Sequence, residues 1–309
     1  MANFKAALEA LAVGKLKHES LSKQLDSILR TSPNFINKML AELDEVYGQK
    51  KLEDKQYSVL KNQITKFRKA HILKANKNVF VEKPLAITLD ELNIIDETYH
   101  KINQYDAVRL MVGFNRRYAP HIIKMKTLLE SSKSPKSIIM TVNAGTISKD
   151  HWVQDINIGG GRIIGEGCHF IDLMRHLVGH KIVDFTTTIM GNVPGIETRE
   201  DKASISLSFE DGSFGTIHYF SNGSSSFPKE RIEVFCDNAV LQIDNYLVLT
   251  GYGWPGFKKM KLFKQDKGQK ACAKAFIESI VNGNDSPIPY DEVFESSRVS
   301  IEVANSLRN

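Results

Sequence analysis

The chain has 309 residues and a mass of 34.8 kDa, which is long enough for about two domains. Hydrophobic residues make up 42% and charged residues 25%, values typical of a folded globular protein, which excludes disordered and collagen-like classes. No apolar run approaches the length of a membrane span and no secretory signal is visible, so we expect a cytoplasmic protein without a membrane span. The three cysteines are too few and too scattered for a disulfide framework or a zinc site, so we expect free thiols and no metal.

The net charge of +5 is unevenly distributed along the sequence. Residues 1–78 contain 15 Lys and Arg against 8 Asp and Glu, whereas the rest of the chain contains 26 against 28. Such asymmetry can indicate an arm that binds nucleic acid or a membrane. Here the lysines are interspersed with acidic residues among periodic apolar ones. We therefore interpret them as a solvated helical face and expect no nucleic-acid partner.

Residues 4–70 are predicted to be helical. Apolar residues recur at helical spacing on two early faces, first Phe4, Ala7, Leu8 and Leu11, then Leu21, Leu25, Ile28 and Leu29. Ser32-Pro33 opens a further helix that ends near Gly48, and a last one runs from about 52 to 64. This pattern predicts a small bundle or docking module in which no residue suggests chemistry.

The pattern then changes to alternating strands and helices. Residues 78–81 form a short strand of buried type that is followed by Glu82-Lys83-Pro84, and a second strand covers 108–113. Between them, Thr88 and Glu91 form a capping box that opens a helix. A strand, a helix and a strand within about 35 residues make one βαβ unit of a parallel sheet.

From about residue 118 the pattern is α+β. The predicted helices are 120–130, 167–177, 271–281 and 292–307, and the predicted strands are 137–142, 183–190, 203–209, 215–220, 231–236 and 240–243. Asp211-Gly212 is a strong hairpin signal between two of these strands.

Two residues are candidates for proton-transfer chemistry. Lys83 stands just past a strand end, where ligands of open α/β sheets gather, and Pro84 keeps it out of helical geometry. His169 lies in the first turn of a predicted helix and could exchange protons near neutral pH. The alternatives are an ordinary surface lysine and a packed structural histidine. Asp172 could orient His169 or merely cap the turn, and Cys168 points in another direction from His169, which disfavours a Cys–His nucleophile.

Two further clusters are open to more than one interpretation. The triple glycine 159–161 lacks the register of a dinucleotide or Walker A loop, so a loop that brings substrate against the backbone is the alternative. Asn115-Arg116-Arg117 follows a strand end and is either an anion or sugar contact or a solvated basic cluster.

Several segments taken together resemble the Gfo/Idh/MocA oxidoreductases, the family of glucose–fructose oxidoreductase and inositol dehydrogenase. They are Asn78-Val-Phe-Val-Glu-Lys-Pro-Leu-Ala, Val112-Gly-Phe-Asn-Arg-Arg-Tyr and the stretch 159–173. Segments 151–155, 227–235 and 250–259 resemble more narrowly the C-terminal half of bi-domain oxidoreductases. Those proteins join an alcohol-dehydrogenase-like half to a Gfo/Idh/MocA half and are associated with surface-polysaccharide synthesis. The resemblance covers about residues 66–309.

The resemblance implies transfer of a hydride between NAD or NADP and a sugar or nucleotide sugar. Lys83 would lie between nicotinamide and substrate, with His169 acting beside it in acid–base transfer. The cofactor side would be formed by Glu82, Lys83 and Pro84, and the substrate side by Asn115, Arg116, Glu166 and Asp172. The aspartate that the family usually has four residues before the histidine is Gly165 here, and Glu166 could stand in for it. The family also implies a homo-oligomer built through its sheet.

One part of the family pattern is missing. A dinucleotide fold needs a glycine-rich first βα turn and an acidic residue about 20 positions later, and residues 1–65 supply neither. We therefore expect a helical segment unrelated to the family (1–65), a Rossmann remnant (66–117) and a C-terminal domain with a large, mostly antiparallel open sheet (118–309), an α+β chain that looks like a fusion or truncation product.

Two hypotheses on function follow. The first is an oxidoreductase by descent whose own NAD(P) binding is lost. The second is a non-catalytic module that docks a partner or oligomerises through its sheet or its N-terminal helices. If the site is inherited, Lys83 and His169 should face one cleft with their side-chain nitrogens within roughly 10 Å, and Asn115 and Arg116 should line it.

Overall fold

The computed structural model describes residues 4–21, 23, 25, 36–49, 52–53, 56, 60, 73, 76–104, 108–192, 194 and 199–308. They divide into two compact units, each described here by itself. The first comprises Met1–Val79, Thr88–Arg109 and Ile156–Ile158, and the second comprises Phe80–Ile87, Leu110–Asp155 and Gly159–Asn309. The division into 1–65, 66–117 and 118–309 stays a prediction.

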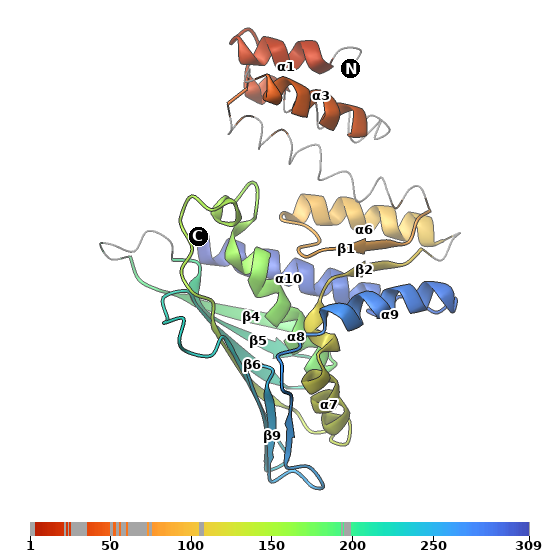
Figure 1. Ribbon diagram of the computed structural model, residues 1–309, viewed down its shortest axis with the longest axis vertical. Helices are drawn as coiled ribbons and strands as arrows, with labels where there is room; N and C mark the ends of the chain where they lie inside the picture. The colour runs from red at the N-terminus through yellow and green to blue at the C-terminus, as the bar shows by residue number, and fades with distance from the viewer. Residues whose placement is uncertain are drawn as a thin grey trace. The chain divides into compact units, whose positions relative to one another are not determined.

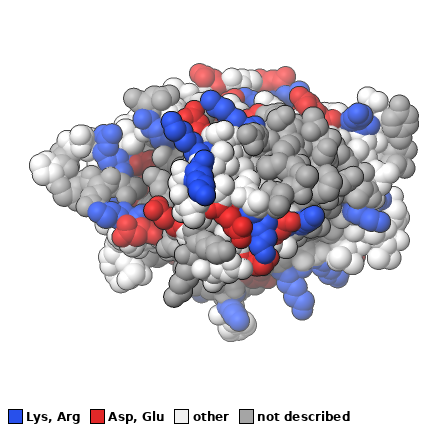
Figure 2. All heavy atoms as spheres, turned by 90° about the horizontal axis from the view of Figure 1, so that it is seen from above, with Lys and Arg blue, Asp and Glu red and all other residues white. Residues whose placement is uncertain are grey.

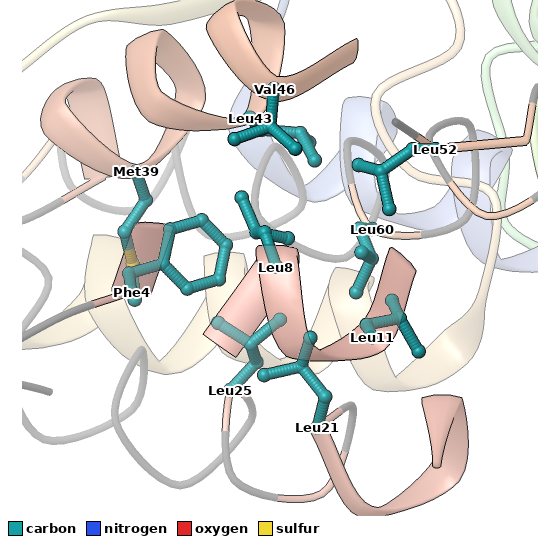
Figure 3. Close-up of a cluster of buried hydrophobic side chains, with 10 residues drawn as sticks. All are labelled: Phe4, Leu8, Leu11, Leu21, Leu25, Met39, Leu43, Val46, Leu52 and Leu60. Atoms are coloured by element: carbon teal, nitrogen blue, oxygen red, sulfur yellow. The ribbon is translucent and has the colours of Figure 1, made fainter. Parts of the chain in front are cut away.

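The first unit contains helices α1 (Phe4–Ala12), α3 (Ile36–Gly48) and α6 (Leu89–Asn103). Its core is a cluster of ten buried apolar side chains, shown in Figure 3: Phe4, Leu8, Leu11, Leu21, Leu25, Met39, Leu43, Val46, Leu52 and Leu60. The predicted stripe of α1 is confirmed, because all three of its buried residues belong to it. The predicted helix start at Pro33 and most of the predicted helix 52–64 lie outside the described residues.

Helix α6 joins two short strands, β1 (Val79–Val81) and β2 (Leu110–Val112), which form a two-stranded sheet. The capping box is confirmed, because Thr88 Oγ1 accepts a hydrogen bond of 3.2 Å from the Glu91 amide. The amide of Val79 donates to the Arg109 carbonyl and that of Gly113 donates to the Val81 carbonyl. These bonds advance in the same direction along both strands, as in a parallel pair.

The second unit is built on an eight-stranded open sheet in the order β10-β9-β8-β7-β3-β6-β5-β4 (Figure 1). Its strands are β3 (Ser137–Asn143), β4 (Ile182–Ile189), β5 (Lys202–Phe209), β6 (Phe214–Phe220), β7 (Glu230–Cys236), β8 (Ala239–Asp244), β9 (Val248–Tyr252) and β10 (Lys259–Lys261). Every neighbouring pair is antiparallel except β3 and β6, which run parallel with Ser137 beside Phe214. The predicted fold class, with a large and mostly antiparallel open sheet, is confirmed.

The helices of this unit are α7 (Pro120–Leu129), α8 (Cys168–Val178), α9 (Gln269–Val281) and α10 (Tyr290–Arg308). Helix α8 packs on the inner face of the sheet, where the ring of Phe170 meets that of Tyr219. A Cβ atom at Gly215 of β6 would lie 2.6 Å from the sulfur of Met174. Glycine at this position therefore lets helix and sheet approach closely.

The two faces of the sheet differ in exposure. Inner residues of β3, β6 and β7 such as Met140, Ile217 and Ile232 are buried, as expected of the core. On the outer face, Ile139, Phe214 and Phe235 are exposed. Phe214 and Phe235 flank Ser137 from the two sides of β3, so these aromatic rings belong to one patch.

Charges of both signs are mixed on the face drawn in Figure 2, where Lys and Arg lie scattered among Asp and Glu. Lys23–Glu19 and Lys38–Glu42 are helical pairs four residues apart, which agrees with a solvated helical face. None of the helices within the described ranges has the length and hydropathy needed to cross a membrane. The same residues contain no group of three His, Cys, Asp or Glu placed to hold a metal ion.

Candidate active site

Lys83 lies on the turn that follows β1 and is half-buried. Its ammonium donates a hydrogen bond to the main-chain carbonyl of Gly165. That carbonyl belongs to a single π-helical turn, Ile163–Gly167, which leads directly into α8. Such turns interrupt the regular helical hydrogen bonds and occur often at functional sites.

The triple glycine before this turn is used for close packing of the chain itself. A Cβ at Gly159 would lie 2.4 Å from the Cα of Val153, and Gly160 and Gly161 have φ values of +73° and +82°. Only glycine combines this approach with left-handed backbone geometry. This packing explains why the three residues are glycines, and no bound ligand is needed to explain them.

His169, in the first turn of α8, is 5% exposed. Its Nδ1 is buried and has no hydrogen-bond partner among the residues that the structure describes. Its ring meets the Phe114 ring edge-on, with the centroids 6.2 Å apart. Burial, followed by the nearby positive charges, lowers the pKa of His169 well below its usual value. The imidazole is therefore neutral near pH 7.

The structure brings Lys83 and His169 to the same turn. The carbonyl that accepts from Lys83 lies four residues before the histidine, and the charge of Lys83 is one of those that lower the pKa of His169. Both residues belong to the second compact unit. The two residues are 86 positions apart in the sequence, so no local pattern connects them.

Glu166 has three hydrogen-bond donors. Its carboxylate accepts from Lys229 Nζ at 2.7 Å, from Tyr219 Oη at 2.5 Å and from Arg162 Nη2 at 3.0 Å. Burial raises the pKa of Glu166, but these three hydrogen bonds outweigh it and lower that pKa to about 2. Lys83 meanwhile donates to the Gly165 carbonyl, and the assignment of Glu166 as a substitute for the missing aspartate stays a prediction.

Asn115 and Arg116, in the 3₁₀ turn Asn115–Tyr118 after β2, are both engaged with the chain. The Asn115 amide donates to the Lys267 carbonyl at 2.6 Å. Arg116 is buried and forms two hydrogen bonds with Glu230, at 2.8 and 2.9 Å, while Lys267 Nζ contacts the same carboxylate at 2.6 Å. Arg116 therefore contributes a positive charge beside His169 from a fixed position.

Asp172 is fully buried and paired with Arg117 through two hydrogen bonds of 2.7 and 2.8 Å. This pairing disfavours both the predicted substrate contact and the predicted orientation of His169, since the carboxylate faces the guanidinium. Cys168 is buried as well, and burial raises the pKa of its thiol to about 12. The thiol stays protonated, as expected for a cysteine that is not a nucleophile.

Glu82 is exposed, and its Oε2 lies 3.1 Å from the position that a Cβ at Gly113 would occupy. Pro84 is half-buried and follows a cis peptide bond. The assignment of Glu82 and Pro84 to a cofactor site stays a prediction.

The segment before β2 determines whether this chain can hold a dinucleotide. The only glycines before Gly113 are Gly14 and Gly48, so no glycine-rich βα turn precedes β2 to receive a pyrophosphate. The sheet formed by β1 and β2 has two strands in the described part of the chain. The residues present therefore do not fit the pyrophosphate and ribose of NAD(P).

Comparison with known proteins identifies residues 134–242 with the GFO/IDH/MocA C-terminal domain. The chain is 26% identical over 174 residues to the uncharacterized oxidoreductase YrbE of Bacillus subtilis, covering 55% of this chain and 49% of that protein. It is 25% identical over 175 residues to myo-inositol 2-dehydrogenase of Thermotoga maritima, covering 56% and 51%. The chain thus spans about half the length of these curated relatives.

Among solved structures, levoglucosan dehydrogenase in complex with NADH and levoglucosan superposes with a TM-score of 0.65 at 17% identity, covering 81% of this chain and 76% of that one. An oxidoreductase domain protein from Kribbella flavida gives 0.64 at 19% identity, covering 78% and 75%. At these identities the likeness shows the fold alone.

Proposed function

Because the chain belongs to the Gfo/Idh/MocA family through its C-terminal domain, we propose that it is the substrate-binding part of a sugar or polyol oxidoreductase. Lys83 and His169 are its acid–base pair in this proposal. The observation that carries it is the hydrogen bond from Lys83 to Gly165, which holds an ammonium on the turn that presents a neutral, buried histidine.

This pair suits the removal of a proton from a hydroxyl group. A neutral imidazole can accept the proton, and an ammonium on the other side of the hydroxyl stabilises the negative charge that develops on oxygen. Losing this proton is the part of alcohol oxidation that side chains can perform. The hydride must go to a nicotinamide, for which the family uses NAD or NADP.

Cofactor binding by this chain alone is not part of the proposal. Since its residues do not fit a pyrophosphate, the dinucleotide would need a glycine-rich turn from another segment or another chain. We infer that the isolated chain binds a sugar and does not bind NAD(P)H.

The substrate class is supported by the names of the relatives. One is a myo-inositol 2-dehydrogenase, another a glucose-6-phosphate 3-dehydrogenase, and a structural neighbour contains levoglucosan. The compounds in these three names, myo-inositol, glucose 6-phosphate and levoglucosan, are all cyclic and carry several hydroxyl groups. A nucleotide sugar and a role in surface-polysaccharide synthesis rest only on the resemblance to the bi-domain oxidoreductases.

Ligand-observed NMR with myo-inositol, levoglucosan and glucose tests the proposal. We expect saturation transfer from the wild-type chain to at least one of them, and its loss in His169→Gln and Lys83→Met. Lys274→Met is the matched control, because this lysine is exposed on α9. Absence of transfer to all three compounds, or transfer unchanged in both site variants, would overturn the proposal.

A second candidate function is self-association through the outer face of the sheet, which does not depend on catalysis. It is favoured by the exposed outer patch of Ile139, Phe214 and Phe235 on the central strands, since clustered apolar side chains on a sheet face are typical of an interface. The two functions are compatible, and a homo-oligomer through this face is the partner that we propose.

A further inference from the structure

The charges of four cationic side chains, Arg116, Lys83, Lys267 and Lys229, lower the pKa of His169. Lys83 comes from the turn after β1, and Arg116 comes from the 3₁₀ turn after β2. Lys229 lies in the segment just before β7, and Lys267 lies in the segment before α9. Residues far apart in the sequence thus contribute positive charge near His169.

Two carboxylates balance this group only in part. Glu230 contacts Arg116 and Lys267, and Glu166 contacts Lys229. Four cations against two carboxylates leave a surplus of two positive charges. Arg162 does not reduce it, because it adds a further cation to Glu166, and its other neighbour Asp201 is already paired with Lys202.

Lys83 accounts for much of the surplus. Within the described ranges no carboxylate lies within ion-pair distance of its ammonium, which has the neutral Gly165 carbonyl as its acceptor. Lys229, which contacts Glu166 next to Gly165 on the same turn, keeps 41% of its side chain exposed. Each ammonium has three N–H donors, so both can bind a further acceptor.

The histidine supplies an independent sign of a missing ligand. A ring nitrogen buried without a hydrogen-bond partner is costly, and native proteins usually satisfy such atoms. Nδ1 of His169 is such an atom. A bound molecule with hydroxyl or acidic oxygens would accept hydrogen bonds from the two lysines.

We propose that the sugar bound at this site is an acidic one, a sugar acid or a sugar phosphate, whose anionic group lies against Lys83 and Lys229. This inference rests on the proposed sugar-binding function and specifies its substrate class. A neutral polyol would exclude water from the site and leave the surplus charge without a counterion, which is unfavourable. A carboxylate or phosphoryl group would compensate it.

The test is isothermal titration calorimetry of the full chain with D-glucuronate, D-glucose 6-phosphate and D-glucose, three sugars that differ in the group at C6. We expect one of the two anionic sugars to bind at least about tenfold more tightly than glucose, as hydrogen bonds to charged groups allow. Its affinity should fall as NaCl is raised, since salt screens the attraction. Whichever anion binds more tightly identifies the acidic group.

Variants of Lys229 and Lys83 test whether these two lysines cause the preference for an anionic sugar. Lys229→Gln should weaken the preferred anionic sugar about tenfold, whereas Lys229→Arg keeps the charge and should retain most of the affinity. Lys274→Gln, on exposed α9, is the control for a general loss of positive charge. A melting curve for each variant verifies folding, and Lys83→Met provides a second test should Lys229→Gln fail to fold.

The outcomes separate the inference from the proposed function. If glucose binds as tightly as both anionic sugars and loses affinity in His169→Gln, the inference is overturned and the proposed function stands. If inorganic phosphate binds as tightly as glucose 6-phosphate, the preference is for any anion and the inference is overturned. If none of the three sugars binds and myo-inositol and levoglucosan show no saturation transfer either, the proposed function itself fails.

Discussion

The ammonium of Lys83 donates its hydrogen bond to the main-chain carbonyl of Gly165, at the position where related oxidoreductases are expected to have an aspartate side chain. A carbonyl carries no net charge, so it positions the lysine without neutralising it. The consequence is a site whose lysine and histidine are held together and whose charge is left positive.

Restoring a carboxylate at this position should reverse that charge effect. A Cβ at Gly165 would meet Val153 Cγ2 at 3.4 Å and the Gly159 carbonyl at 3.6 Å, both ordinary contacts. We expect Gly165→Asp to fold and to weaken binding of an anionic sugar by about tenfold or more, because the new carboxylate pairs with Lys83 and repels the ligand. Gly165→Asn is the neutral control of equal size in the same calorimetric titration. An equal loss in both variants would mean that size, and not charge, is responsible.

The buried pair of Arg117 and Asp172 should be important for stability. Neither side chain is solvated, so replacing Asp172 by Asn removes the negative charge that compensates the buried Arg117 guanidinium. We expect Asp172→Asn to lower the free energy of unfolding by about 3–5 kcal/mol in urea denaturation. The more accessible pair Arg298–Glu302, whose side chains are 38% and 30% exposed, is the control, with Glu302→Gln costing under about 0.5 kcal/mol. Similar losses in the two variants would contradict the structural role assigned to Asp172.

Glu166 should make stability depend on pH in the acid range. Its pKa falls from 4.5 to about 2 on folding, so the folded state favours the ionised form. The resulting stabilisation is present above pH 4.5 and is lost as the pH falls towards 2. Relative to Glu166→Gln, we expect a wild-type advantage of up to ~3 kcal/mol at pH 7 that shrinks below pH 4.5. Urea denaturation of both proteins at several pH values measures it, and a difference independent of pH would contradict the assignment.

His169 should remain neutral where an ordinary histidine becomes charged. Because burial and nearby cations lower its pKa, the unfolded chain takes up this proton first, so His169 reduces stability as the pH falls below 6.5. We expect the ring C2–H resonance of His169, assigned by its loss in His169→Gln, to keep its chemical shift from pH 8 to about 5.5. A titration midpoint at or above 6.5 would mean that burial and the nearby cations do not lower the pKa of His169.

The outer patch of the sheet should mediate self-association. Phe214 and Phe235 are exposed on either side of Ser137, so a charge there would oppose burial of the patch against a second copy. We expect wild-type protein to elute as an oligomer in size exclusion with light scattering, and Phe235→Glu to be monomeric. Ile277→Glu, on exposed α9, is the control and should not change the mass. A monomeric wild-type chain would remove the support for this interface.

Local sequence signals predicted most of the fold. The capping box of Thr88, the hairpin turn at Asp211-Gly212 and the period-two burial of β5 and β6 all depend on neighbouring residues, and each is confirmed. Strands β9 and β10 were missed. Gly251 interrupts the first, and the second has three residues with lysine at both ends, so neither shows the alternation that identifies a strand.

The candidate site could be predicted only in part. Lys83 and His169 stand in recognisable segments, whereas the partners that set their surroundings are distant in sequence. Tyr219 contacts Glu166 from β6 and Lys229 contacts it from the segment before β7, and no local pattern connects them to it. Arg162 could have been found, because it lies one helical turn before Glu166.

The central claim is that this chain retains the sugar side of an oxidoreductase site and does not bind the dinucleotide by itself. Calorimetric titration of the chain with NADH and with NADPH tests it most directly. We predict no saturable heat from either cofactor up to millimolar concentration, because no glycine-rich turn receives the pyrophosphate. Saturable binding of NADH or NADPH in the micromolar range would contradict the claim.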